Sequence, residues 1–348
     1  QEVAEAEVLL LVKSQNSMEL IGDIAMCNGL ASSLKYTCYS QVIKEITARG
    51  QNETILAMQT VKNLLRRPSE ILEECHFVAH EFGFYLANQD GIGGMQKCLA
   101  EADDCSLGCY HGIGEYLFFK SNGNLESKDL SFLQTQEDNF NTFAMYHALG
   151  HPIYRFTNDI EKSKSMCDSI AIKNRNRALM CYGGYTHEFI LDRFFSNASF
   201  EDIADDCKKL NGMEDECYIS LGYIYSIFGI NRSLGRCYDA GSRFCIEGVG
   251  HYIDGIYTNG NLPMSFETCD SSIRDKSLLH LCYSGIVRIS LYYYNNITRA
   301  LSACSLRQNY KTRCYDDLKN IYNNLWFNAS LNFCHYVEEP YKQKCYEE

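Results

Sequence analysis

The sequence lacks the short motifs that mark common hydrolases and nucleotide-binding proteins. It contains no G-x-S-x-G nucleophile elbow, and the GIGG segment at 91–94 follows no predicted strand and precedes no G-K-[ST]. Positive charge is also scarce, since the formal net charge is −12. Proteins that bind nucleic acid need a basic face, so we expect no nucleic-acid partner.

Long apolar runs and prolines are few as well. The longest apolar run extends only from Val8 to Val12, so we expect no transmembrane segment. With four prolines and no long polar tract, the chain offers no obvious linker between domains. A chain that begins at Gln1 is compatible with a mature protein from which a signal peptide has been removed.

Cysteine, by contrast, is abundant, and its 18 residues are even in number. The absence of any C-x2-C pair disfavours a cysteine-rich zinc site, and the absence of C-x-x-C-H excludes covalent haem. We therefore expect a disulfide framework and an extracellular or cell-surface location. Five N-x-[ST] sequons give modest support to a secreted glycoprotein with N-linked glycans: Asn52, Asn197, Asn231, Asn296 and Asn328.

The cysteines also reveal a repeat. A first cysteine is followed after a short segment by a second, usually with a tyrosine next to it. The second cysteines, or the residues in their place, recur every 28–37 residues, close to the period of two-helix repeats. Glu74 and Met145 hold the place of the second cysteine in two repeats. The pairs predicted by this spacing are Cys27–Cys38, Cys167–Cys181, Cys207–Cys217, Cys237–Cys245, Cys269–Cys282, Cys304–Cys314 and Cys334–Cys345.

The segment 75–109 departs from the simple spacing. Cys98 and Cys109 are separated like the other pairs, which leaves Cys75 and Cys105 to join neighbouring hairpins. Four cysteines allow three connectivities, so the alternatives stay open at this stage.

The repeat predicts an all-α fold. Helix A ends near the first cysteine and helix B begins near the second, so each disulfide closes a short hairpin and contributes about 2–3 kcal/mol. Small residues recur just inside helix B (Gly112, Ala148, Gly184, Gly248, Gly285) and indicate close helix approach, because glycine otherwise weakens a helix. We expect a right-handed superhelix, or α-solenoid, of about nine two-helix repeats. The alternative is a non-repetitive all-α domain.

Three parts are expected along this superhelix. Residues 1–60 form capping helices and the first hairpin, 61–195 form histidine-rich repeats, and 196–348 form cysteine-rich repeats.

Two resemblances accompany the repeat. The segment CKKLNGMEDECYISLGYIY (207–225) resembles the Sel1-like, tetratricopeptide-like repeats of cysteine-rich secreted proteins, in which L-G-x-x-Y follows a hairpin disulfide; Leu221, Gly222 and Tyr225 match. The pattern C-H-x3-H-x2-G followed by C-x5-H-G, within 74–117, resembles a group of secreted microbial proteins without an established function. Neither resemblance implies a reaction.

Seven of the nine histidines keep a fixed register to the second cysteine or its substitute. His76, His111 and His147 follow it by two residues, and His80, His151, His187 and His251 follow it by six. Positions four apart share one face of a helix, so these histidines should line one face of the B helices. His280 and His335 lie outside the register.

This pattern predicts metal binding. We expect His76, His80 and His111 to converge on one metal ion and His147, His151 and His187 on another, or the two groups to merge. Imidazoles suit zinc and copper, and the two H-x3-H pairs resemble coupled binuclear copper sites in their spacing. Three nearby carboxylates are possible further ligands or orienters of the histidines: Glu81, Glu115 and Glu188.

The leading functional hypothesis is therefore a secreted helical-repeat glycoprotein that binds copper or zinc. The main alternative is an extracellular structural, adhesion or filament-forming protein, in which the histidines are ordinary buried residues bonded to backbone carbonyls. A third is a metal-dependent oxidase or hydrolase, which would require an open coordination position and a substrate pocket.

Overall fold

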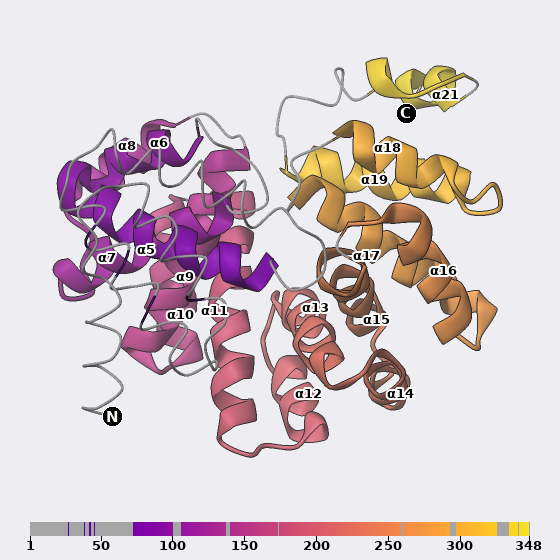
Figure 1. The fold of residues 1–348 in the computed structure, drawn as a ribbon, viewed down its shortest axis with the longest axis horizontal. Coiled ribbons are helices and arrows are strands. Elements are labelled where there is room, and N and C mark those ends of the chain that lie inside the picture. The colour runs from indigo at the N-terminus through magenta and orange to yellow at the C-terminus, as the bar shows by residue number, and fades with distance from the viewer. Residues whose placement is uncertain are drawn as a thin grey trace. The chain divides into compact units, whose positions relative to one another are not determined.

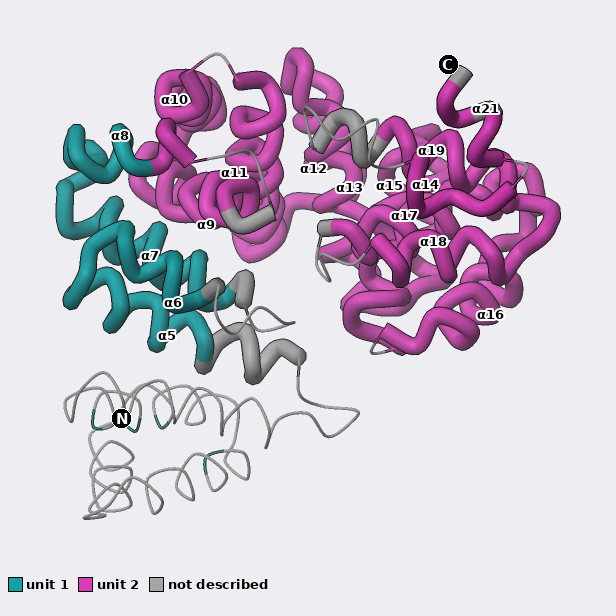
Figure 2. Tube along the Cα trace, turned by 90° about the horizontal axis from the view of Figure 1, so that it is seen from above, with its two compact units in different colours: residues 1–132 teal, residues 133–348 magenta. Residues whose placement is uncertain are grey.

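The computed structural model describes residues 27, 38, 42, 45, 72–99, 106–136, 140–172, 174–258, 260–292, 297–325, 334–339 and 341–347. Every regular element in these residues is a helix, in agreement with the predicted all-α class (Figure 1). The chain divides into two compact units, residues 1–132 and 133–348 (Figure 2). The capping helices expected in 1–60, and the sequons Asn52, Asn296 and Asn328, lie outside the described residues.

The described part of unit 1 is built on one helix pair. Helix α5 (Leu72–Asp90) packs along α7 (Ser106–Lys120), and between them in sequence lie the 3-10 turn η1 (Gly91–Gly94) and the short helix α6 (Met95–Leu99). The disulfide Cys98–Cys109 joins α6 to α7. The expected pair Cys75–Cys105 lies outside the described side chains. Helix α8 (Ser127–Thr135) crosses the boundary between the two units.

Two sets of helices alternate along unit 2, and we call them long and short because most members of the first set are the longer, although α15 is not longer than its neighbours. Its long helices pack in series, α9 on α11, α11 on α13, α13 on α15, α15 on α17 and α17 on α19. Their bounds are α9 Phe140–Thr157, α11 Arg175–Phe195, α13 Glu214–Tyr225, α15 Arg243–Tyr252, α17 Leu279–Tyr292 and α19 Lys311–Leu325. The elements between and after them are α10 Ile160–Ala171, α12 Phe200–Lys208, η2 Ser226–Phe228, α14 Ile230–Ala240, η3 Ile253–Tyr257, α16 Leu262–Ser272, η4 Lys276–Leu278, α18 Ile297–Ser305 and α21 Tyr341–Glu347.

This serial packing is what paired-helix repeats would produce. The handedness of a superhelix and the number of repeats stay predictions. None of the helices within the described residues is both long and apolar enough to cross a membrane.

Disulfides join each short helix of unit 2 to the long helix that follows it. They are pairs that the cysteine spacing predicts: Cys167–Cys181, Cys207–Cys217, Cys237–Cys245, Cys269–Cys282 and Cys304–Cys314, with Cys334–Cys345 near the end of the chain and Cys27–Cys38 in unit 1. Each bond closes a loop of only 8–14 residues, so it fixes the hairpin locally.

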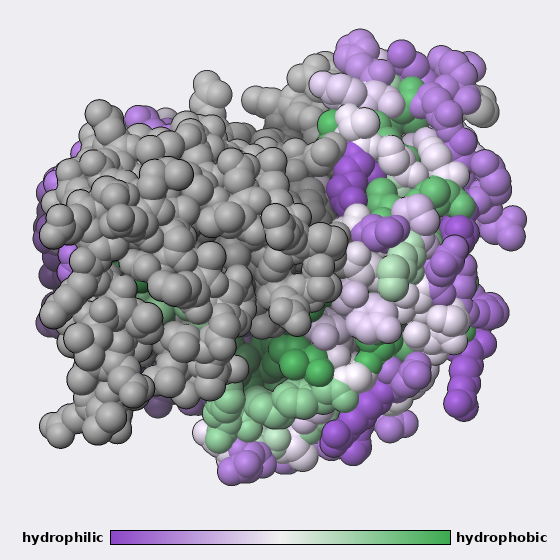
Figure 3. All heavy atoms as spheres, viewed as in Figure 1, coloured by the Kyte–Doolittle hydropathy of each residue, from purple (hydrophilic) through white to green (hydrophobic). Residues whose placement is uncertain are grey.

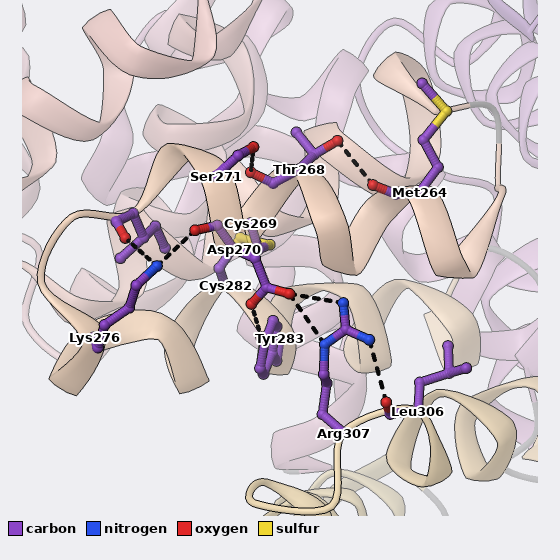
Figure 4. A network of polar contacts seen from close by, with 11 residues as sticks. Met264, Thr268, Cys269, Asp270, Ser271, Lys276, Cys282, Tyr283, Leu306 and Arg307 are labelled. Carbon is purple, nitrogen blue, oxygen red and sulfur yellow. Dashed lines mark hydrogen bonds and ion pairs between the residues drawn. A yellow bond between two sulfur atoms is a disulfide. The ribbon is translucent and has the colours of Figure 1, made fainter.

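Polar contacts support the hairpin closed by Cys269–Cys282 (Figure 4). Tyr283 donates a hydrogen bond to the carboxylate of Asp270, and the same carboxylate accepts from Arg307, with Nη2 at 2.7 Å (Figure 4). Lys276 donates to the carbonyl oxygens of Asp270, at 2.6 Å, and Ile273, at 3.0 Å. A cation at these last carbonyls of α16 compensates hydrogen bonds that the helix end leaves unmade.

Glycines bring the backbones of neighbouring long helices into direct contact. A Cβ atom built on Gly184 of α11 would lie 2.0 Å from the carbonyl oxygen of His147 in α9, and one on Gly150 of α9 would lie 2.1 Å from that of Cys181. No side chain fits at such distances. The close approach expected at the recurring glycines of helix B is thereby confirmed at Gly112, Gly184, Gly248 and Gly285.

The same contacts correct the register of the first histidine pair. In unit 1, Gly112 faces the carbonyl oxygen of His80 at 1.9 Å from its ideal Cβ, as Gly184 faces that of His147. His80 is therefore the structural counterpart of His147, two residues after the cysteine position, and Val78 rather than Glu74 holds that position. The assignment from sequence was one helical turn early, because α5 carries no cysteine at that position to mark it.

Candidate metal centre

Helices α9 and α11 carry His147, His151 and His187, and local sequence signals set where the helices of this region begin. The side chain of Asn174 caps α11 by accepting from the backbone N–H groups of Asn176, at 3.1 Å, and Arg177, at 3.2 Å. Asp159 caps α10 in the same way. These caps satisfy donors that the first helical turn leaves without partners.

His147 and His151 lie one turn apart on α9, and their rings meet. Nε2 of His147 is 3.3 Å from Nε2 of His151, and the ring centroids are 5.0 Å apart. This agrees with the expected geometry of an H-x3-H pair on a helix. Both histidines therefore present a ring nitrogen to the same small space.

A carboxylate fixes the orientation of His151. Oε1 of Glu188, on α11, lies 2.8 Å from Nδ1 of His151, and both oxygens of Glu188 also accept hydrogen bonds from Arg155, at 2.8 and 2.9 Å. Burial alone would raise the pKa of Glu188, but the hydrogen bond and charge of His151, and then those of Arg155, hold it well below its usual range.

The ionised state of Glu188 determines the tautomer of His151. An ionised carboxylate only accepts hydrogen bonds, so Nδ1 of His151 is the donor. In neutral His151 the free lone pair is then on Nε2, the atom that faces His147. A histidine held by a carboxylate in this way is the usual arrangement around protein-bound zinc.

His187, the third histidine that the sequence places with this pair, lies next to His151. Its ring centroid lies 5.6 Å from that of His151 and 5.9 Å from that of Tyr223 on α13. Burial, and to a smaller extent charge on His151, lower the pKa of His187 to about 4. His187 is therefore neutral at physiological pH, the state in which imidazole binds a metal ion.

The 3.3 Å separation fits two ligands of one metal ion. Two nitrogen atoms at about 2.0–2.1 Å from a tetrahedral zinc ion lie about 3.3–3.4 Å from each other. The nitrogens of His147 and His151 already have this spacing. The same distance also suits an N–H···N hydrogen bond, so the pair is chemically competent for either role.

In unit 1, Nε2 of His80 lies 3.4 Å from Oε2 of Glu115, and its ring stacks on Phe84 with centroids 5.8 Å apart. His111 is buried on α7. The side chain of His76 lies outside the described residues, so convergence of His76, His80 and His111 stays a prediction. Glu81 is half-buried on α5.

His251, on α15, keeps the same spacing to its cysteine as His151 and His187, but the charges around it differ. Arg288 of α17 stands near this histidine and lowers its pKa, after the larger effect of burial, to about 3. Arg288 also pairs with Glu216 at 2.8 Å and Glu247 at 3.0 Å. A guanidinium beside His251 disfavours a bound cation there.

Sequence reasoning missed Arg155, which donates hydrogen bonds to both carboxylate oxygens of Glu188. A signal for it existed, since Arg155 follows His151 by four residues and therefore lies on the same helix face.

No family model matches the chain, and neither the curated proteins nor the solved structures include a match. The resemblance to Sel1-like repeats thus depends on the residues of 207–225 alone.

Proposed function

We propose that this protein is a secreted helical-repeat glycoprotein that binds a transition metal, copper or zinc, through His147, His151 and His187. The observation that carries the proposal is the pair of Nε2 atoms of His147 and His151, 3.3 Å apart, with the opposite nitrogen of His151 held by Glu188. Three neutral imidazoles would supply three ligands and leave one position open in a tetrahedral site. A second set in unit 1, His76, His80 and His111, belongs to the same proposal.

The chemistry of the donors supports copper or zinc rather than calcium or magnesium. The hard cations prefer six or more oxygen ligands, whereas imidazole nitrogen suits zinc and copper. Glu188 would act by orienting His151, since its two oxygens are already occupied by His151 and Arg155.

Metal analysis of the full chain, purified without chelators from an oxidising compartment, tests the proposal. We expect bound zinc or copper, and a lower metal content in His151→Ala and His147→Ala. His335→Ala is the matched control, because His335 is exposed and outside the register. Equal metal content in all four proteins, or none in the parent after exposure to zinc and to copper, contradicts the proposal.

The extracellular structural or adhesion protein is kept as the second candidate because of one observation. His147 and His151 can satisfy each other through a hydrogen bond between the same two nitrogens, without any metal ion. In that case His147→Ala would lower stability but not metal content. An oxidase or hydrolase would require a reaction at the open position.

A further inference from the structure

An aromatic cluster lies where α11 and α13 end. Phe194 is at its centre: its ring stacks on Phe228 with centroids 4.8 Å apart, and it meets the edges of Phe195 at 5.7 Å and Tyr225 at 5.9 Å. Phe200, at the start of α12, packs against Tyr225 at 4.7 Å. We call these five residues the Phe194 cluster.

The outer members of the cluster are exposed to a degree that is unusual for aromatic side chains. Phe195 is 76 % exposed and Phe228 is 44 % exposed, and the neighbouring Ile227 is 53 % exposed. The space-filling view shows apolar surface gathered low on this face, over the region of α11 and α12 (Figure 3). Contiguous exposed apolar surface of this kind marks an interaction site.

Both exposed phenylalanines stand just before a sequon. Asn197 follows Phe195 by two residues and Asn231 follows Phe228 by three, and both asparagines are exposed. Asn197 has a φ of 61° in the turn between α11 and α12, so the chain folds back directly after Phe195. Glycan attachment points thus lie within three residues of both exposed phenylalanines in the sequence.

We propose that N-linked glycans at Asn197 and Asn231 cover the Phe194 cluster, with the first sugar of each packed on the ring of Phe195 or Phe228. The C–H bonds on the apolar face of a sugar point toward the negative face of an aromatic ring, which gives a weak attraction and removes apolar surface from water. This inference depends on the secretion included in the proposed function but not on metal binding. The glycan proposal and the metal proposal can therefore fail independently.

The covalent step joins Nδ2 of each asparagine to C1 of the first sugar of a lipid-diphosphate-linked oligosaccharide. The amide loses one proton, and the lipid diphosphate leaves with the bonding electrons of the broken C1–O bond. In the folded chain both sequon serines are engaged: Ser199 caps α12 by accepting from the N–H of Asp202, and Ser233 is buried and donates to the carbonyl of Gly222. Transfer therefore precedes completion of α12 and α14.

Site-resolved mass spectrometry of the full chain, secreted from a eukaryotic host that performs N-glycosylation, tests attachment. We expect Asn197 and Asn231 to be occupied. Phe195→Ala and Phe228→Ala should leave both sites occupied, because transfer precedes the packing of the sugar on the ring. Empty asparagines in folded, secreted protein overturn the proposal.

Enzymatic removal of the glycans tests the packing. We expect it to lower the folding equilibrium constant of the parent about 2–10-fold, the range of one aromatic contact, and to have a clearly smaller effect in Phe195→Ala. Phe119→Ala, which removes an exposed phenylalanine of unit 1 with no sequon beside it, is the control and should behave as the parent.

Equal effects in all three proteins overturn the packing. So does concentration-dependent self-association of the glycosylated parent that Phe195→Ala abolishes, since a second copy of the chain would then occupy the cluster.

Discussion

Gly184 rests directly on the backbone of His147, because a Cβ atom at Gly184 would lie 2.0 Å from the carbonyl oxygen of that histidine. The contact sets the distance between α9 and α11. It thereby sets how far Glu188 and His187 of α11 stand from His151 of α9. The packing of the two helices therefore determines the geometry of the histidine group.

Gly184→Ala should therefore damage both stability and the histidine group. The added methyl meets backbone, which cannot turn aside, so we expect a loss of about 1–3 kcal/mol or more in the free energy of unfolding and weaker metal binding. Gly235→Ala is the matched control, since Gly235 lies in α14 with nothing within 4 Å of its ideal Cβ. It should raise stability by about 0.5–1 kcal/mol. Urea unfolding of both variants measures the difference, and equal effects would refute the direct contact.

Glu188→Gln should weaken metal binding without unfolding the chain. Glutamine retains the shape but not the charge, so Nδ1 of His151 loses its ionised acceptor and Arg155 loses its partner. Loss of such a partner lowers metal affinity about 10–100-fold. Competition titration with a chromogenic chelator measures the change. Glu161→Gln, an exposed change on α10, should leave the affinity as it is, and an unchanged affinity in Glu188→Gln would exclude the orienting role.

Much of this fold follows from the spacing of its cysteines. A disulfide requires that two cysteines meet at a hairpin, so the spacing of Cys207 and Cys217 already places a turn between two helices. Helix periodicity then puts residues four apart, such as His147 and His151, on one face.

What the sequence did not determine is the register where the cysteine is missing. In α5 the glycine contact between Gly112 and the carbonyl of His80 fixes the register, and such a contact is a property of two helices together. The interaction of Arg155 with Glu188 could not be predicted for the same reason, since it joins residues 33 positions apart on two helices.

The disulfide Cys237–Cys245 offers a test of how the hairpins are stabilised. It closes the shortest of the described loops, with a sequence separation of 8, between α14 and α15. Replacing both cysteines by serine should cost about 2–3 kcal/mol, because the unfolded chain regains loop entropy and two hydroxyl groups become buried. Peptide mapping without reduction should recover this pair in the parent. A partner for Cys237 other than Cys245 would remove the hairpin model.

Stability should fall as the pH is lowered from 7 to 5, and His251 should cause part of that fall. Burial and the charge of Arg288 lower the pKa of His251 to about 3 in the folded state, from 6.5 in the unfolded chain. Below pH 6.5 His251 therefore binds a proton in the unfolded chain but not in the folded protein. The contribution of neutral His251 to the free energy of unfolding is complete above pH 6.5 and is lost as the pH falls toward 3. At pH 5 the loss from this one group is about 2 kcal/mol.

The groups around His251 are consistent with this sign. Arg288 repels a proton on the imidazole, while Glu247, one turn earlier, is already paired with Arg288 and offers little compensation. His251→Leu removes the titrating group and should flatten the dependence of the free energy of unfolding on pH between 7 and 5. His335→Leu, at an exposed position, should leave the slope unchanged. Urea unfolding at pH 7 and at pH 5 measures the slope. If the parent is as stable at pH 5 as at pH 7, His251 accepts its proton in the folded state and the prediction is wrong.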